Sequence, residues 1–167
     1  MVYSVDLFAT NLSPWDWVPT WQQTVVSHGY NTYAPQVIVS GQADGKAGVF
    51  EAARGTWTGT TGASVYDWPG DGTNIVLLID MPYVGDNSCR TAFLPKDFFY
   101  PSDDQGWNWD PNGNTEDMVN KFANRNYGNT QAKGLDGKYY ELSCVISQGT
   151  QVDAHFTMQP VANSTTK

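Results

Sequence analysis

Segment 98–113 gathers aromatic side chains of the types that bind lipid surfaces and sugar rings. Its sequence, FFYPSDDQGWNWDPNG, is otherwise rich in polar and turn-forming residues, so we expect a loop there. Aromatic rings on a loop lose water readily and keep a polar edge, which suits a membrane interface or the face of a sugar. The predicted platform consists of Tyr100, Trp107 and Trp109. The alternative is that some of these rings close one end of the core, because ordinary domains bury most large aromatic side chains.

A second candidate site lies at the exit of the apolar run 75–79. The run ends abruptly in Asp80, Met81, Pro82 and Tyr83. An unbroken apolar run of this length predicts a strand that loses water on both faces. Its end is therefore either the closed tip of a buried hairpin or the rim of a binding site.

Other groupings of reactive side chains fit structural roles better. Oxygen-bearing side chains between positions 110 and 117 are calcium ligands in type, but Gly113 does not match the spacing of an EF-hand loop. We interpret them as a solvated turn that caps a helix. His155 and Asp153 are two positions apart and are interpreted as a surface pair. We therefore predict no metal site and no cofactor.

The sequence also lacks the motifs of common hydrolases. It contains no nucleophile elbow, no HExxH pattern, no CxxC pair and no phosphate-binding loop. Neighbouring carboxylates such as Asp103 and Asp104 rarely reach the separation of about 5 to 9 Å that glycosidases use. We therefore expect a protein without catalytic residues, and a glycan-active enzyme is the alternative.

Size and charge limit the partners. The chain has 167 residues, enough for one domain with a real core. Its net charge of -8 repels phosphate backbones and anionic lipids, so nucleic acid is excluded as a partner. Zwitterionic headgroups and glycans remain compatible with this charge. No signal peptide or transmembrane run is visible, so we expect a soluble protein, cytoplasmic or released without a classical signal, that acts at a membrane or cell surface.

Short alternating apolar runs predict strands along most of the chain. We expect strands at 3–7, 15–26, 37–39, 49–53, 63–68, 74–80, 142–146 and 152–158, with hairpins around PGDGT and SQGT. Regular strands without helical crossovers favour a mostly β fold, an antiparallel β-sandwich. The domain is expected to span 1–162, with 163–167 as a flexible tail.

One short helix is predicted at 115–124, on a face of the sandwich. Met118, Val119 and Phe122 share one side of this segment, and it carries capping and dipole-compensating residues at its ends. We expect it to cover the outer face of the run 75–79, which needs a partner on each side.

Two further groups of residues bear on the core. Trp15, Trp17 and Trp21 lie at odd spacing on one strand and are interpreted as a buried stripe. Cys89 and Cys144, 55 positions apart, either form a disulfide or are two small buried side chains.

The central segment carries a pattern found in a family of membrane-binding proteins. It comprises FEAAR at 50–54, TG at 58–59, VY at 65–66, DGTN at 71–74 and MPY at 81–83, and it ends at Asn87. This pattern, over about a quarter of the chain, resembles that of the actinoporins, cytolysins built as a β-sandwich with flanking helices. The aegerolysins and the fungal fruit-body lectins have related sandwiches. The resemblance implies membrane binding through a phosphocholine headgroup and an exposed aromatic cluster.

Matched position by position, the resemblance implies a headgroup pocket. Its residues are Ser27, Val65, Pro82, Tyr83 and, as a looser match, Tyr127. Asp80 stands where the family usually has a serine, and 120–124 lacks the tyrosine pair of the family's second helix. An acidic Asp80 can bind a choline ammonium group or accept hydrogen bonds from sugar hydroxyls. The implied ligand is therefore a zwitterionic lipid headgroup or a glycan.

Actinoporins form pores with an amphipathic helix that precedes their first strand, whereas here a strand is predicted from Tyr3. We therefore expect a protein that binds lipid headgroups without that pore helix. Perforation would then require an oligomer or a second, pore-forming partner at the membrane. The alternative is a lectin that uses the same surface for glycans.

Overall fold

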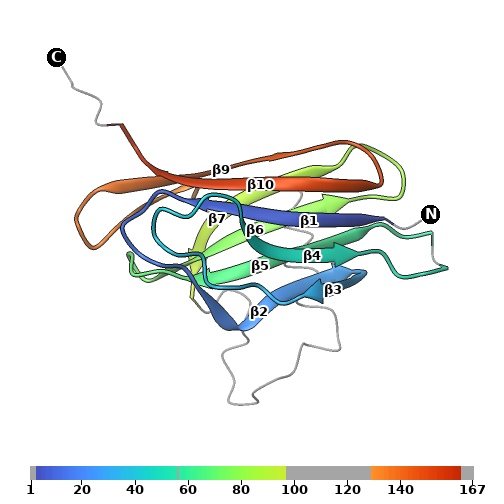
Figure 1. Ribbon diagram of the computed structural model, residues 1–167, viewed down its shortest axis with the longest axis horizontal. Coiled ribbons are helices and arrows are strands. Elements are labelled where there is room, and N and C mark those ends of the chain that lie inside the picture. Colours follow the sequence, from blue (N-terminus) through green and yellow to red (C-terminus); the bar gives the residue numbers. More distant parts are fainter. Residues whose placement is uncertain (1–2, 56, 97–128, 163–167) are drawn as a thin grey trace.

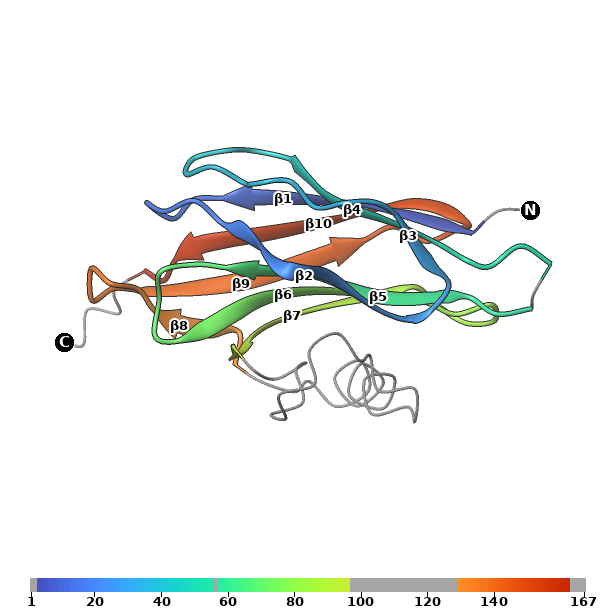
Figure 2. The same ribbon diagram turned by 90° about the horizontal axis from the view of Figure 1, so that it is seen from below.

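Ten strands in two layers make up the described part of this computed structural model, residues 3–55, 57–96 and 129–162 (Figure 1). The larger sheet contains, in order across it, β3 (Tyr30–Tyr33), β4 (Gly45–Glu51), β1 (Ser4–Asn11), β10 (Gln151–Pro160), β9 (Tyr139–Ile146) and β8 (Gln131–Lys133). The smaller sheet contains β2 (Val18–His28), β5 (Thr60–Asp67), β6 (Thr73–Met81) and β7 (Ser88–Pro95). The two sheets face each other (Figure 2), which confirms the predicted mostly β sandwich.

Strands β1 and β10 lie side by side in the middle of the larger sheet. Both alternate between buried and more exposed residues, as the sequence predicts for strands with one face on a core. They pair in parallel, with Ser4 opposite Gln151 and Asn11 opposite Met158, whereas all other neighbouring strands pair antiparallel. Because these two strands are far apart in the chain, no tight turn forces them to run in opposite directions.

The space between the sheets is filled by large apolar side chains. Trp17, Phe50 and Phe156 are fully buried there. Trp15 is partly buried and packs against the same core, so two of the three tryptophans of the predicted stripe lie in or against it. The side chain of Trp21 is outside the described part of the protein.

Strand β6 loses water on both faces, as its unbroken apolar run predicts. Ile75, Leu77 and Ile79 belong to the core between the sheets. Val76 and Leu78 point the opposite way, because side chains alternate along a strand, and belong to a second buried cluster. The remaining members of that cluster are Val25, Ala63, Val65, Ala92 and Leu94. The helix predicted as a cover for this face, 115–124, lies outside the described residues.

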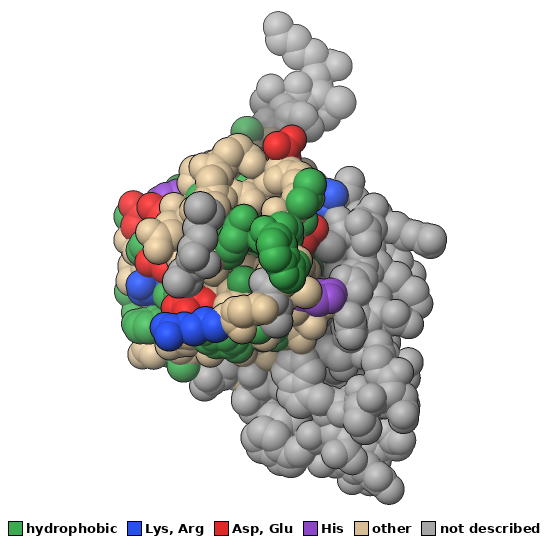
Figure 3. All heavy atoms as spheres, turned by 90° about the vertical axis from the view of Figure 1, so that its right-hand side faces the viewer, with side chains coloured by type: hydrophobic (Ala, Val, Ile, Leu, Met, Phe, Trp, Pro, Cys, Tyr) green, Lys and Arg blue, Asp and Glu red, His purple; other side chains and the backbone are tan. Residues whose placement is uncertain are grey.

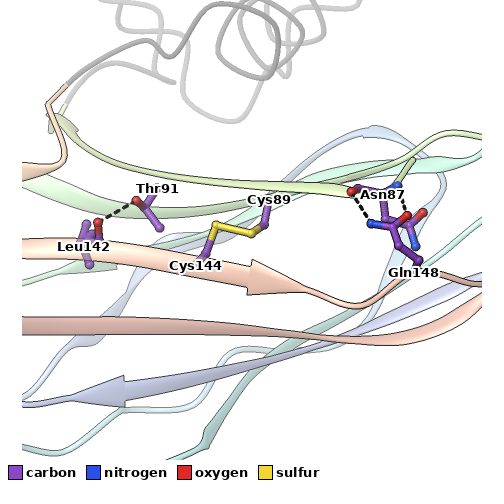
Figure 4. The surroundings of a disulfide bond; sticks show 6 residues. All are labelled: Asn87, Cys89, Thr91, Leu142, Cys144 and Gln148. Atoms are coloured by element: carbon purple, nitrogen blue, oxygen red, sulfur yellow. Dashed lines mark hydrogen bonds between the residues drawn. A yellow bond between two sulfur atoms is a disulfide. The ribbon is translucent and has the colours of Figure 1, made fainter. Parts of the chain in front are cut away.

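A disulfide joins the two sheets (Figure 4). Cys89 in β7 and Cys144 in β9 are bonded, with their Cα atoms 6.2 Å apart, which decides between the two alternatives that the sequence leaves open. Hydrogen bonds cross between the sheets on either side of it. Thr91 donates from Oγ1 to the carbonyl oxygen of Leu142 at 3.3 Å, and Gln148 donates from Nε2 to the carbonyl oxygen of Asn87 at 3.0 Å.

Aromatic rings close the end of the sandwich at which β1 stops. Trp15 contacts Trp68 and Tyr140, with ring centroids 5.8 and 5.5 Å apart. Tyr140 is only 2% exposed, and its hydroxyl donates to Oδ2 of Asp136 at 2.7 Å. Desolvation, the hydrogen bond to Asp136 and the charge of that carboxylate raise the pKa of Tyr140 to about 12.

This raised pKa predicts a loss of stability at alkaline pH. In the unfolded chain Tyr140 ionises near its ordinary pKa of 10.0, whereas the folded protein holds the proton up to about pH 12. The folded state therefore binds more protons in this window, and the free energy of unfolding falls as pH rises through it. Burial raises the pKa of Tyr66 and adds a contribution of the same sign. Urea midpoints should fall less steeply above about pH 10 in Tyr140→Phe than in the wild type, and parallel curves would contradict this assignment.

Several predicted features lie outside the described residues. They are the aromatic platform of Tyr100, Trp107 and Trp109, the looser pocket candidate Tyr127, and the tail 163–167. Within the residues that the structure does describe, no helix has the length and apolarity needed to cross a bilayer. The same residues contain no group of three or more His, Cys, Asp or Glu side chains arranged to hold a metal ion.

Candidate functional site

Three strand ends meet at the opposite end of the sandwich, where β2 and β6 stop and β5 begins. Gly29 follows β2 with a φ of 82°, a left-handed conformation that suits glycine, and turns the chain into β3. A Cβ atom at Gly59 would overlap the carbonyl oxygen of Met81, so the loop before β5 lies tightly against the end of β6. These strand ends line an open pocket of about 280 Å³, which we call the Tyr83 pocket. Its lining residues are His28, Trp57, Thr58, Gly59, Thr61, Asp80, Met81, Pro82 and Tyr83.

Two aromatic rings form one side of the Tyr83 pocket. Trp57 and Tyr83 meet edge to face, with ring centroids 5.3 Å apart and planes at 75°. Tyr83 also contacts Tyr3, just before β1, with ring centroids 5.6 Å apart. Trp57 is 80% exposed, and Val84, which follows Tyr83 in the chain, is 83% exposed. Figure 3 views this end of the molecule and shows hydrophobic side chains gathered on it.

Asp80 brings a negative charge to the same pocket. Its Oδ1 atom accepts a hydrogen bond of 2.7 Å from Oγ1 of Thr61, on the neighbouring strand β5. Within residues 3–55, 57–96 and 129–162, no cationic side chain forms an ion pair with this carboxylate. A half-buried carboxylate beside two aromatic rings can attract an ammonium group, or it can accept hydrogen bonds from hydroxyls.

The structure brings together most of the described residues that the sequence assigns to the site. Asp80, Pro82 and Tyr83 all line the pocket. Ser27 lies next to it, because its Oγ atom is 2.9 Å from Nδ1 of the pocket residue His28.

Val65 is also assigned to the site by the sequence, but in the structure it lies outside the Tyr83 pocket. It is on the same face of β5 as Thr61 but four positions further along, a distance of about 13 Å. Its side chain is 1% exposed and belongs to the second buried cluster. Val65 therefore packs in the buried cluster further along that face and does not line the pocket.

Trp57 is the main pocket residue that sequence reasoning missed. It lies between Gly55 and Gly59 in a loop of small and polar residues. Such a loop offers no strand position that faces the core, so a large ring in it is a good candidate for exposure. A large ring in a loop of small and polar residues is thus a local signal of exposure. The alternating patterns that predict strands do not detect it.

Comparisons with known proteins support the fold. No protein-family model and no curated protein matches the sequence. The structure is similar to a crystal structure of the lipid binding protein Nakanori, with a TM-score of 0.63 and 13% identity over 94% of this chain and 71% of that chain. It is also similar to the lectin XCL of Xerocomus chrysenteron, with a TM-score of 0.52 and 15% identity over 95% of this chain and 100% of that chain. At these identities the similarity shows a shared fold.

Proposed function

We propose that this protein binds membranes by holding a zwitterionic lipid headgroup in the Tyr83 pocket. The observation that carries the proposal is the position of the Asp80 carboxylate in one pocket with the rings of Trp57 and Tyr83. Aromatic faces and a carboxylate both attract a quaternary ammonium group. Such a group cannot donate hydrogen bonds, so it matches a site in which rings contribute much of the wall.

The apolar surface beside the pocket favours a lipid over a free solute. Trp57 and Val84 are among the most exposed apolar side chains of the described residues. At a membrane interface they would lose water, which contributes about 25 cal/mol for each Å² buried. The net charge of -8 favours zwitterionic over anionic lipids. The disulfide fits a protein that meets membranes in an oxidising environment.

A glycan is the second candidate ligand for the Tyr83 pocket. Asp80 and Thr61 offer oxygen atoms to sugar hydroxyls, and a ring such as Trp57 can stack on the face of a sugar. The lectin XCL has the same fold.

Asp80→Asn tests the role of the carboxylate. The amide oxygen can still accept the hydrogen bond from Thr61, so the fold should be retained while the negative charge is lost. We expect the wild type to cosediment with phosphatidylcholine vesicles but not with phosphatidylglycerol vesicles. The substitution should weaken phosphatidylcholine binding about tenfold, equivalent to about 1.4 kcal/mol.

Asp153→Asn is a matched control, because Asp153 is an exposed carboxylate on β10, away from the pocket. It should bind phosphatidylcholine vesicles like the wild type. Equal binding of the wild type to both kinds of vesicle, or to neither, would contradict the lipid proposal. Capture of a soluble glycan that Asp80→Asn abolishes would support the second candidate instead.

A further inference from the structure

A second cavity lies at the end of the sandwich closed by the aromatic rings of Trp15, Trp68 and Tyr140. It has a volume of about 450 Å³, and we call it the distal pocket. Three segments form its walls: the connection after β1, the loop before β4 and the turn between β8 and β9. The residues relevant to its chemistry are Leu12, Pro14, Ser40, Asp136, Lys138 and Tyr140.

Strand β1 separates the distal pocket from the Tyr83 pocket. Tyr3, just before this strand, contacts Tyr83, whereas Leu12, just after it, lines the distal pocket. From position 3 to position 12 there are nine residue steps, which span roughly 30 Å at about 3.3 Å per residue. Figure 1 shows the turn between β8 and β9 and the connection between β6 and β7 at opposite ends of the sandwich. A ligand in one pocket therefore leaves the other accessible.

A buried hydrogen-bond network fixes two of the three walls. Asn11 is fully buried, and its Nδ2 atom donates to the carbonyl oxygens of Trp15 at 2.7 Å and Ile38 at 3.1 Å. Its Oδ1 atom accepts from the hydroxyl of Ser13 at 2.6 Å. Ser40 then donates from Oγ to the carbonyl oxygen of Ser13 at 2.7 Å. These contacts join the segment after β1 to the loop before β4, so the pocket is formed before any ligand binds.

The third wall carries one charge of each sign. Asp136 accepts from the hydroxyl of Tyr140 through Oδ2 and from the backbone amide of Lys138 through Oδ1, at 2.7 and 3.0 Å. Desolvation opposes ionisation of Asp136, but these hydrogen bonds and the positive charge of Lys138 outweigh it and hold the pKa of Asp136 below the ordinary value. The Lys138 ammonium forms no ion pair within the described part of the chain. The wall therefore presents a fixed acceptor and an available donor.

Part of the distal pocket lining is apolar. Leu12 is 48% exposed there, and the ring of Pro14 is exposed next to it. The pocket thus combines an aliphatic surface with a carboxylate, an ammonium group and the oxygen of the Ser40 hydroxyl. Hydroxyls of a sugar can donate to Asp136 and accept from Lys138, while the C–H face of its ring covers Leu12.

From this arrangement we infer that the distal pocket is a second binding site, for a neutral carbohydrate. The pocket lining carries one negative and one positive side chain, Asp136 and Lys138, so its charges cancel and give an anion such as phosphate or a simple cation little net attraction. Asp136 is the only carboxylate among the residues that line the pocket, so the described site lacks the carboxylate pair with which most glycosidases cleave a sugar. We therefore infer that the distal pocket binds the carbohydrate without cleaving it. This inference is independent of the lipid proposal, because the two pockets share no residue.

The test is capture of neutral oligosaccharides by the complete chain, followed by calorimetric titration of a captured one. An array should present glycans that end in galactose, mannose or N-acetylglucosamine. We expect the wild type to bind at least one of them. Asp136→Asn and Lys138→Ala should each weaken that binding about tenfold or more, because each removes a charged hydrogen-bond partner.

One matched control and one variant of the other pocket locate the effect. Lys133→Ala removes an exposed lysine from β8 and should bind the oligosaccharide like the wild type. Asp80→Asn changes the Tyr83 pocket and shows whether the captured oligosaccharide occupies that pocket instead. Lys138 is exposed, so its replacement leaves the fold intact even if Asp136→Asn proves unstable. The inference is overturned if the wild type captures no neutral glycan. It is also overturned if Asp80→Asn abolishes the capture while Asp136→Asn and Lys138→Ala do not.

Discussion

Membrane binding should be lost when Trp57 and Tyr83 are both replaced by alanine. The two rings can bury roughly 200 Å² of further apolar surface in a membrane, which corresponds to about 5 kcal/mol at ~25 cal/mol per Å². We therefore expect the affinity for phosphatidylcholine vesicles to fall at least ~100-fold. The substitutions should change the fold little, because Trp57 is 80% and Tyr83 37% exposed in the free protein. The melting temperature should fall by less than about 4 °C.

Tyr139→Ala is the control for this double variant. Tyr139 is an aromatic residue of β9 with 55% exposure, and it does not line the Tyr83 pocket. Its replacement should leave vesicle binding unchanged. If Trp57→Ala/Tyr83→Ala binds vesicles like the wild type, the aromatic rim is not the membrane contact. A double variant that unfolds would show instead that the two rings support the core.

Removal of the disulfide should have the largest effect on stability. Cys89 and Cys144 are separated by 55 positions, and a cross-link that closes a loop of this length stabilises a fold by about 4 kcal/mol, mainly by restricting the unfolded chain. For a domain of this size, such a loss lowers the melting temperature by roughly 10 °C. The double variant Cys89→Ala/Cys144→Ala should show this shift in a thermal unfolding experiment.

Reduction of the wild type provides an independent measurement of the same contribution. A reducing agent should lower the melting temperature of the wild type by a similar amount and leave that of the double variant unchanged. Identical melting temperatures for the oxidised wild type and the double variant would show that the other contacts between β7 and β9 hold the sheets together without the bond. One of these is the hydrogen bond from Thr91 to Leu142.

The sequence predicted the strands of the sandwich best where their pattern is local. The run 75–79 indicated a strand buried on both faces, and β6 has this property. The alternation at the two ends of the chain likewise identified β1 and β10. It did not predict that they are parallel neighbours, because a pattern within one strand carries no information about the direction of its partner.

The candidate site was less predictable, because it depends on how loops meet. Tyr83 was expected at an exposed rim and is exposed, but its partner Trp57 comes from a different loop. Val65 shows the reverse case, since a match to a family pattern located the right strand but not the right depth along it. The pairing of Cys89 with Cys144 also depended on the packing of the two sheets, which spacing alone does not determine.

The parallel arrangement of β1 and β10 has a practical consequence for attaching the protein to a solid support. Strand β1 begins beside Tyr83, whereas β10 finishes at Pro160, next to the opposite end of the sandwich. Protein attached to a biosensor chip beyond Pro160 would expose the Tyr83 pocket, with Trp57, to the solution. Protein attached ahead of Ser4 would instead expose the distal pocket, with Asp136. Reversing the tether would therefore let the two pockets be assayed one at a time on an unmutated molecule.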